Sequence, residues 1–239
     1  MNLLLLQPDQ CSVDPLVADQ VTLTDSRQLK HIHEHLKLTV GDSIKVGMRD
    51  GLKGTATVAS LTEQQIVLDH VLLTDPPPSK LPLTLIIALP RPKVLRRLIM
   101  DAVTLGAERI ILLHSYRVEK SYWQSPFLQQ IDAYIQLGLE QAGDTVWPII
   151  ELKKRFRPFV EDELPLLSQD KLALVAHPYA AQSCPAQIKQ PCVLVIGCEG
   201  GFIPFEIDLL QQNGCLPVSL GQRILRTETA VAHVLGRLF

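Results

Sequence analysis

Four short runs of almost uninterrupted apolar residues constrain the fold of this chain more than any other feature. They occupy residues 83–89, 109–114, 171–176 and 192–197. Such a run is typical of a strand buried on both faces of a sheet. The segments between them repeat apolar residues at helical spacing, and strands that alternate with helices indicate a mainly parallel sheet. The sequence therefore predicts an α/β fold with helices on both faces.

Local signals place the remaining elements of this region. Pro92 suits the first turn of a helix, and Gly106 suits the position where it ends. Helices are predicted over residues 92–105, 127–139 and 205–212 and from a Thr227 cap onward, and short strands over 146–150, with Pro148 near a sheet edge, and 216–221.

Three consecutive prolines, Pro76–Pro78, separate this region from a different N-terminal pattern. Consecutive prolines exclude a helix and favour a stiff extended spacer. The N-terminal part shows short alternating runs punctuated by turns, with strands predicted over 21–23, 43–47, 54–59 and 65–72 and a helix over 26–38. We therefore expect a small β-rich domain at 1–74, a linker at 75–82 and an α/β domain at 83–239.

Charge and cysteine content narrow the class of protein. Lys and Arg total 23 against 25 Asp and Glu, which gives a net charge of −2. The chain has no overall basic excess of the kind that indicates nucleic-acid binding, so any such binding would require a local basic patch. No apolar run approaches the ~20 residues of a membrane span. The five cysteines are odd in number and form no Cys-x-x-Cys pair, which favours a reducing cytoplasm over disulfides.

Ligands of open α/β sheets bind beyond the carboxyl ends of the strands. Three predicted strand exits therefore matter: 176–178, 196–201 and 220–226. In the second, Gly197, Gly200 and Gly201 remove side chains where backbone must approach a ligand or adopt positive φ. A turn that binds no ligand is the alternative.

The glycine loop does not match known phosphate loops. No Lys-Ser/Thr pair follows it, and its spacing is not Gly-x-Gly-x-x-Gly. A loop of exposed main chain with one carboxylate, Glu199, suits instead an adenosine-type or cationic ligand.

Two arginines, Arg223 and Arg226, lie three residues apart between a predicted strand and the last helix. They can share one side of a turn and hold an anion or a polarised carbonyl. A surface ion pair between Arg226 and Glu228 is the alternative.

Other patterns are weaker. In a helix, His31 and His35 share a face but His33 does not, and no further ligand is identifiable, so we expect no metal. Basic clusters occur on the predicted helix 92–105, at Lys93, Arg96 and Arg97 with Arg91 before it, and at 153–157 around Phe156. Each is either a contact to RNA phosphates or a solvated face.

Two strings near the C-terminus carry a resemblance to a known family. Val195-Ile-Gly-Cys-Glu-Gly-Gly-Phe202 with Glu206, and Ser219-Leu-Gly-Gln-Arg-Ile-Leu-Arg-Thr-Glu-Thr-Ala230, resemble the RsmE family of SPOUT-superfamily methyltransferases, which modify N3 of a uridine in small-subunit (16S) ribosomal RNA. Weaker resemblance extends through His31, Lys93, Leu105-Gly106, Arg117 and Glu140–Gly143.

The resemblance implies a fold and partners. It implies an N-terminal PUA-like β-barrel that helps to hold RNA, a C-terminal sheet with a deep trefoil knot, a cytoplasmic homodimer, and S-adenosylmethionine bound in the knot mainly by backbone. The cofactor-binding residues implied by position are Ala176, His177, Pro178, Ile196, Gly197, Glu199, Gly200, Gly201, Leu216, Ser219, Leu220, Gly221, Ile224 and Leu225.

The resemblance also suggests catalytic roles. Arg226 is the first candidate to stabilise the ionised uridine imide, with Arg223 or a basic residue of a partner subunit as rivals, and Glu228 would fix Arg226. Glu199 would accept from cofactor amino groups, offset the sulfonium charge or cap the following turn. His177 is either a ligand contact or a structural histidine.

The chain departs from the family pattern at Lys37, Thr104, Asp144 and Cys198. These departures leave a second reading, a catalytically divergent RNA-binding or ribosome-assembly protein that keeps the fold.

Overall fold

The computed structural model describes residues 2–10 and 20–239 and divides into two compact units. The first unit comprises Met1–Pro78 and Leu139–Trp147, and the second comprises Ser79–Gly138 and Pro148–Phe239. The first stretch ends within the predicted proline linker. The assignment of Leu139–Trp147 to the first unit differs from the domain limits expected from the sequence. Cys11 lies outside the described residues.

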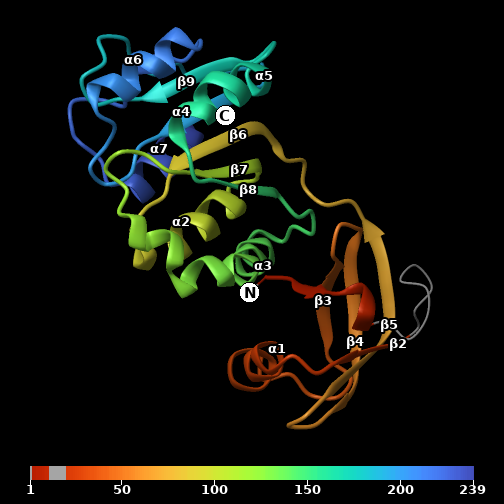
Figure 1. Ribbon diagram of the computed structural model, residues 1–239. Helices are drawn as coiled ribbons and strands as arrows, with labels where there is room; N and C mark the ends of the chain where they lie inside the picture. Colours follow the sequence, from red (N-terminus) through yellow and green to blue (C-terminus); the bar gives the residue numbers. More distant parts are fainter. Residues whose placement is uncertain (1, 11–19) are drawn as a thin grey trace. The chain divides into compact units, whose positions relative to one another are not determined.

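The first unit is built on a five-stranded mixed sheet with the order β1-β3-β4-β5-β2. The β1–β3 pair is parallel and the other pairs are antiparallel. The sheet is curled (Figure 1), but no pair of β1 with β2 closes it in the described residues, so it forms a half-barrel. Its elements are β1 (Leu4–Leu6), η1 (Pro8–Gln10), β2 (Gln20–Leu23), α1 (Ser26–His31), η2 (Ile32–Leu36), β3 (Ser43–Met48), β4 (Lys53–Leu61) and β5 (Ile66–Asp75).

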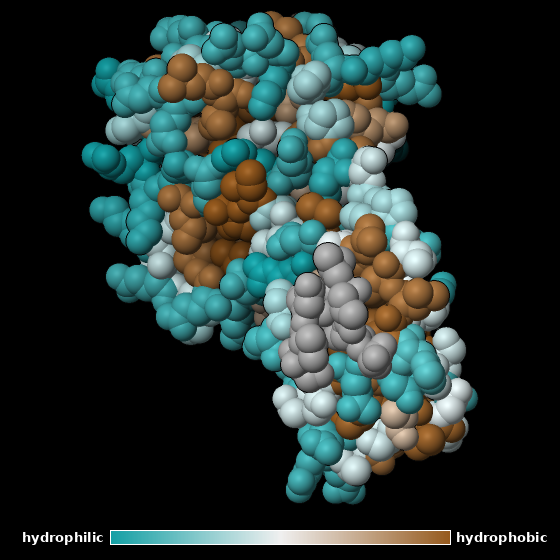
Figure 2. Space-filling view, turned by 90° about the vertical axis from the view of Figure 1, so that its right-hand side faces the viewer, coloured by the Kyte–Doolittle hydropathy of each residue, from teal (hydrophilic) through white to brown (hydrophobic). Residues whose placement is uncertain are grey.

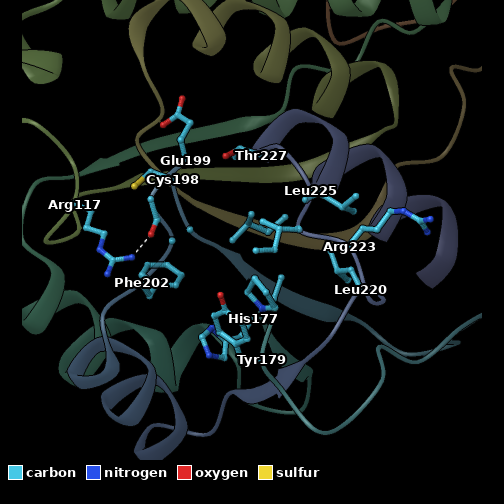
Figure 3. A pocket seen from close by; sticks show the side chains of 18 of the residues that line it. Arg117, His177, Tyr179, Cys198, Glu199, Phe202, Leu220, Arg223, Leu225 and Thr227 are labelled. Atoms are coloured by element: carbon cyan, nitrogen blue, oxygen red, sulfur yellow. Dashed lines mark hydrogen bonds between the residues drawn. The ribbon is translucent and has the colours of Figure 1, made fainter.

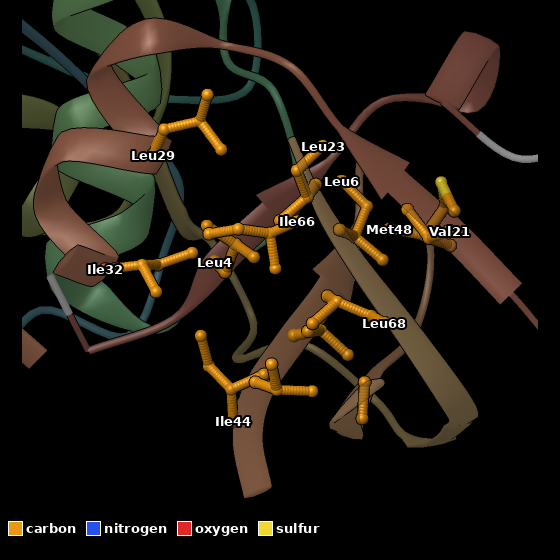
Figure 4. Packing of buried hydrophobic residues seen from close by; sticks show 13 residues of the cluster. Leu4, Leu6, Val21, Leu23, Leu29, Ile32, Ile44, Met48, Ile66 and Leu68 are labelled. Carbon is orange, nitrogen blue, oxygen red and sulfur yellow. The ribbon is translucent and has the colours of Figure 1, made fainter. Parts of the chain in front are cut away.

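Buried apolar side chains, mostly leucine, isoleucine and valine, pack between this sheet and α1 and η2. Figure 4 shows Leu29 and Ile32, from α1 and η2, pointing toward strand residues that include Leu4 and Ile66. All four side chains are at most 6% exposed. β1 was not predicted, because an apolar run of this length is equally compatible with a buried helix.

The second unit contains a six-stranded sheet with the order β11-β9-β10-β6-β7-β8. All of its strand pairs are parallel, which confirms the predicted α/β class. The strands are β6 (Leu81–Ala88), β7 (Ala107–Leu113), β8 (Ile149–Lys153), β9 (Leu172–Ala176), β10 (Cys192–Ile196) and β11 (Leu216–Val218).

Helices surround this sheet, and α2 packs against α7. They are α2 (Pro92–Thr104), η3 (Lys120–Gln124), η4 (Pro126–Gln130), α3 (Ile131–Ala142), α4 (Phe156–Pro158), η5 (Phe159–Glu163), α5 (Leu164–Leu167), α6 (Pro204–Gln212) and α7 (Thr227–Leu238). The knot implied for the stretch from β9 to α7 stays a prediction.

Several predicted boundaries shift for local reasons. The helix expected to reach residue 38 ends as a π-turn, because Lys37 has a φ of 51°, which a helix cannot continue. β8 begins after Pro148, which has no N–H for the ladder, and it is an edge strand as expected. The Thr227 cap is wrong: Arg226 holds the N-cap position of α7, and Thr227 is its first residue.

On the face drawn in Figure 2, hydrophilic side chains cover much of the surface and hydrophobic ones line a hollow.

Among the described residues, no helix has both the length and the apolar character needed to cross a membrane.

Candidate functional site

The carboxyl ends of β9 and β10 and the segment before α7 enclose a cavity of about 280 Å³ (Figure 3). All three strand exits singled out in the sequence therefore meet. The predicted residues that line the cavity are Ala176, His177, Pro178, Ile196, Gly197, Glu199, Gly200, Gly201, Leu220, Gly221, Arg223, Ile224 and Leu225. Leu216, Ser219, Arg226 and Glu228 are not among the lining residues.

The glycine loop brings two backbone segments into direct contact. A Cβ on Gly197 would lie 2.9 Å from Cα of Gly201 and 3.1 Å from its carbonyl carbon. Gly201 has a φ of 68°, and its N–H donates to the carbonyl of Cys198 at 2.8 Å. The part of the cavity wall that this loop forms is therefore main chain, held in a shape that side chains at Gly197 and Gly201 would exclude.

Glu199 has a role that none of the sequence alternatives included. Its Oε1 accepts a hydrogen bond from the backbone N–H of Arg91 at 3.0 Å. Arg91 is the N-cap residue of α2 and makes no capping bond with its own side chain. Glu199 thus caps a helix far away in sequence, where a negative charge is favourable.

Arg117, which only the weaker resemblance included, also lines the cavity. Its Nη1 donates to the carbonyl oxygen of Gly200, shown as a dashed line in Figure 3. Its Cδ lies 2.9 Å from where a Cβ on Gly200 would be, so the arginine stem occupies the space that the glycine leaves. The loop is therefore braced by a residue from the segment after β7.

Glu206 makes a second brace between the same two segments. Its Oε2 accepts from the N–H of Ile203 at 3.0 Å, and its Oε1 accepts from the N–H of Tyr116 at 2.7 Å. The carboxylate is only 2% exposed. Glu206 therefore joins the start of α6 to Tyr116, the neighbour of Arg117. Together, Arg117 and Glu206 tie the glycine loop and the residues that follow it to the segment after β7.

Replacement of Glu206 by alanine is expected to lower the free energy of unfolding by about 2–3 kcal/mol, because two backbone N–H groups lose their acceptor. Urea denaturation followed by circular dichroism measures this change. The matched control is Asp208→Ala, an exposed residue of the same helix, with an expected change within about 0.5 kcal/mol. Equal stability of the two variants would refute the brace.

Further lining residues that the sequence analysis missed are Tyr179, Cys198, Phe202, Thr227 and Ala230. Tyr179 is 80% exposed, and its ring meets the His177 ring edge-on at 5.7 Å between centroids. Its position next to the His177-Pro178 pair at a strand exit was the one available signal.

Burial sets the protonation of two lining residues. It lowers the pKa of His177, so the imidazole is neutral at pH 7. It raises the pKa of the Cys198 thiol, which therefore stays protonated and is a poor nucleophile. Neither residue offers a charge to a ligand, and the fixed charges of the lining belong to Arg117, Glu199 and Arg223.

The two C-terminal arginines occupy different places. Arg223 lines the cavity and is exposed, and Figure 3 shows it on the side opposite Arg117. Arg226 is exposed at the N-cap of α7. Both Arg226 and Glu228 are described in the structure, and no ion pair joins them, so the predicted pairing is wrong.

Two of the family departures have structural roles. Asp144 is 2% exposed, and its Oδ1 accepts from the N–H of Val146 at 3.0 Å. The Thr104 hydroxyl donates to the carbonyl of Gly138 at 3.3 Å, which joins α2 to α3. In the described part of the chain, no group of three or more His, Cys, Asp or Glu is placed to hold a metal ion.

Comparisons with known proteins agree with this geometry. Residues 77–238 match the model of the RNA methyltransferase domain family. The chain is 32% identical to the ribosomal RNA small subunit methyltransferase E of Treponema pallidum over 96% of this chain and 87% of that protein. It is 30% identical to the protein of the same name from Synechocystis over 98% and 76% of the two chains.

Solved structures share the fold. The ribosomal RNA small subunit methyltransferase E of Neisseria gonorrhoeae, solved with S-adenosyl methionine bound, superposes with a TM-score of 0.76 at 20% identity, covering 98% of this chain and 95% of that one. A Legionella pneumophila protein in complex with the same molecule gives 0.77 at 22% identity, covering 98% and 96%.

Proposed function

We propose, on the premise that this chain belongs to the RsmE family of RNA methyltransferases, that it transfers a methyl group from S-adenosylmethionine to N3 of a uridine in 16S ribosomal RNA. The observation that carries the proposal is the cavity at the carboxyl edge of a parallel sheet, with a glycine loop of exposed main chain on one side and Arg223 in its lining. Most of its lining residues come from the two motifs that carry the family resemblance, and the rest come from residues 176–179 and Arg117.

The residues present fit the cofactor. Main-chain groups of the Gly197–Gly201 loop and of the His177 and Leu220–Leu225 segments would hold it, and the glycines provide space that a Cβ would fill. S-adenosylmethionine supplies an electrophilic methyl group when bound. Oε1 of Glu199 accepts the capping bond from Arg91, which leaves Oε2 able to accept from an amino group of the cofactor.

The chain must also make the uridine nitrogen reactive. An imide nitrogen is a poor nucleophile while protonated, so its proton must first pass to water, and the anion that remains spreads its charge onto two carbonyl oxygens. A guanidinium beside the base stabilises that anion and stays charged at any physiological pH. Of the two candidate arginines, Arg223 is the better placed to stabilise this anion, because it lines the cavity and Arg226 does not. The cavity also accelerates the transfer by aligning the methyl carbon with N3 of the uridine.

Three further parts of the proposal follow from the family. The half-barrel of the first unit would help to hold RNA, the enzyme would work as a homodimer, and it would act in the cytoplasm, where ribosomal subunits are assembled. Size-exclusion chromatography with light scattering tests the dimer directly.

Calorimetry with S-adenosylmethionine, followed by methyl transfer to small subunits isolated from a strain that lacks this protein, tests the function. We expect saturable binding and one new N3-methyluridine, located by mass spectrometry of nuclease fragments. Binding without transfer would favour a catalytically divergent RNA-binding or assembly protein. No binding at millimolar cofactor would overturn the enzyme.

A further inference from the structure

A row of basic residues lies along the carboxyl edge of the parallel sheet. β6, β7 and β8 are consecutive neighbours in that sheet, and each is followed by cations: Arg91 after β6, Arg117 and Lys120 after β7, and Lys154 and Arg155 after β8. Neighbouring strands are ~4.8 Å apart, so these exits span roughly 10 Å. The sequence places these residues in separate clusters, and the sheet order brings them to one edge.

The cations at the β8 end of this edge are not equivalent. Lys153 is paired with Glu151 at 2.9 Å and Glu163 at 2.6 Å, and Arg157 is paired with Glu161 at 2.8 Å. Lys154 and Arg155, between them, are exposed and have no ion pair with any described residue. Of the cluster at 153–157, these two therefore carry the uncompensated charge.

One aromatic ring lies beside the Lys154 charge. Lys154 Nζ lies 5.9 Å from the centre of the Trp123 ring, and the Trp123 Nε1–H donates to His114 Nδ1 at 2.9 Å. Phe156 is a different case, because it is 9% exposed and its ring packs on Phe202, so it is not available to stack on a base. Tyr116, which directly precedes Arg117, is 77% exposed.

The edge is continuous with the cavity. The backbone N–H of Arg91 donates to Glu199, and the guanidinium of Arg117 donates to the carbonyl oxygen of Gly200, so both residues are attached to the glycine loop. The carboxylates on this path are Glu199, which caps α2, and Glu119, which accepts from Tyr122 Oη at 3.1 Å. A polyanion that lies along Lys154, Arg155 and Arg117 would deliver one unit into the cavity.

We propose that the edge from Arg91 and Arg117 to Lys154 and Arg155, the β6–β8 edge, binds the phosphate backbone of the RNA strand whose target nucleotide enters the cavity. This inference rests on the proposed function. Backbone phosphates are recognised by Lys and Arg without regard to sequence and fix the register of the strand. The β6–β8 edge therefore positions the RNA, and the cavity selects the base.

The test is the salt dependence of binding to an in vitro transcript of 16S ribosomal RNA. For the double variant Lys154→Ala/Arg155→Ala, we expect the slope of log K against log salt to become shallower by about 1.4–1.8, since each phosphate contact contributes roughly 0.7–0.9. The matched control is Lys171→Ala/Lys189→Ala, which removes two exposed lysines before β9 and β10, at the amino ends of those strands, and should leave the slope within about 0.3 of the wild type.

We expect both double variants to bind S-adenosylmethionine with the affinity of the wild type, which would show that their fold is intact. If a variant misfolds, Lys154→Gln/Arg155→Gln replaces it. The inference would be overturned if the wild type and the Lys154→Ala/Arg155→Ala variant had equal salt slopes, or if the control variant lost as much slope as that variant. Either result would leave the proposed methyltransferase function standing. A wild type that does not bind the transcript at all would instead count against the proposed function.

Discussion

Gly197→Ala is expected to raise the Kd for S-adenosylmethionine at least 100-fold, about 2.7 kcal/mol. The new Cβ would lie 2.9 Å from Cα of Gly201, and the position of each of these atoms is fixed by the backbone. Neither can rotate away as a side chain would, so the loop must move and the main-chain wall of the cavity with it. Isothermal titration calorimetry measures the change.

Gly236→Ala is the matched control for this substitution. Gly236 lies inside α7, and a Cβ there has no neighbour within 4 Å. Its cofactor affinity should equal that of the wild type, and its stability should rise by up to about 1 kcal/mol, since alanine is the better helix former. A Gly197→Ala variant that binds as tightly as Gly236→Ala would show that this loop does not form the cofactor wall.

Arg223→Ala is expected to lower kcat by about 10²–10³ with the cofactor Kd within about threefold, because one donor to the developing anion is lost. Arg226→Ala should lose less, since Arg226 does not line the cavity. Single-turnover methyl transfer at saturating cofactor and RNA compares the two variants, and Arg223→Lys should restore part of the rate because the charge remains.

The reverse order would change the assignment. If Arg226→Ala lost more turnover than Arg223→Ala, the role would belong to Arg226, as the sequence first suggested. A loss confined to KM for RNA in both variants would mean that these arginines bind substrate without stabilising its anion.

Strands buried on both faces were predictable because hydrophobic burial leaves a local signature. The run at 83–89 covers most of β6 and the run at 192–197 contains β10, and these two strands are neighbours at the centre of the sheet. The meeting of three loops was predictable for a related reason, because parallel strands place their carboxyl ends at one edge. Short elements such as β1 lacked enough residues to show a period.

Contacts across long sequence separations were not predictable. Arg117 reaches Gly200 across 83 residues, and Arg91 reaches Glu199 across 108. In the first unit, Arg27 makes two hydrogen bonds to the carboxylate of Glu140, at 2.6 and 2.9 Å, across 113 residues. A single sequence carries no periodic signal for such partners, because each depends on where the chain returns.

By itself, the sequence determined the class of fold, the family and the glycine loop, since each is encoded in residues that are close along the chain. Only the tertiary structure decided which charges are available. Lys153 and Arg157 are engaged in ion pairs, and one oxygen of Glu199 accepts a backbone hydrogen bond. Lys154, Arg155 and Arg223 are exposed and have no ion pair with any described residue. The physical reason is that burial follows local hydrophobicity, whereas the state of a charge depends on every group that the fold places within a few ångströms of it.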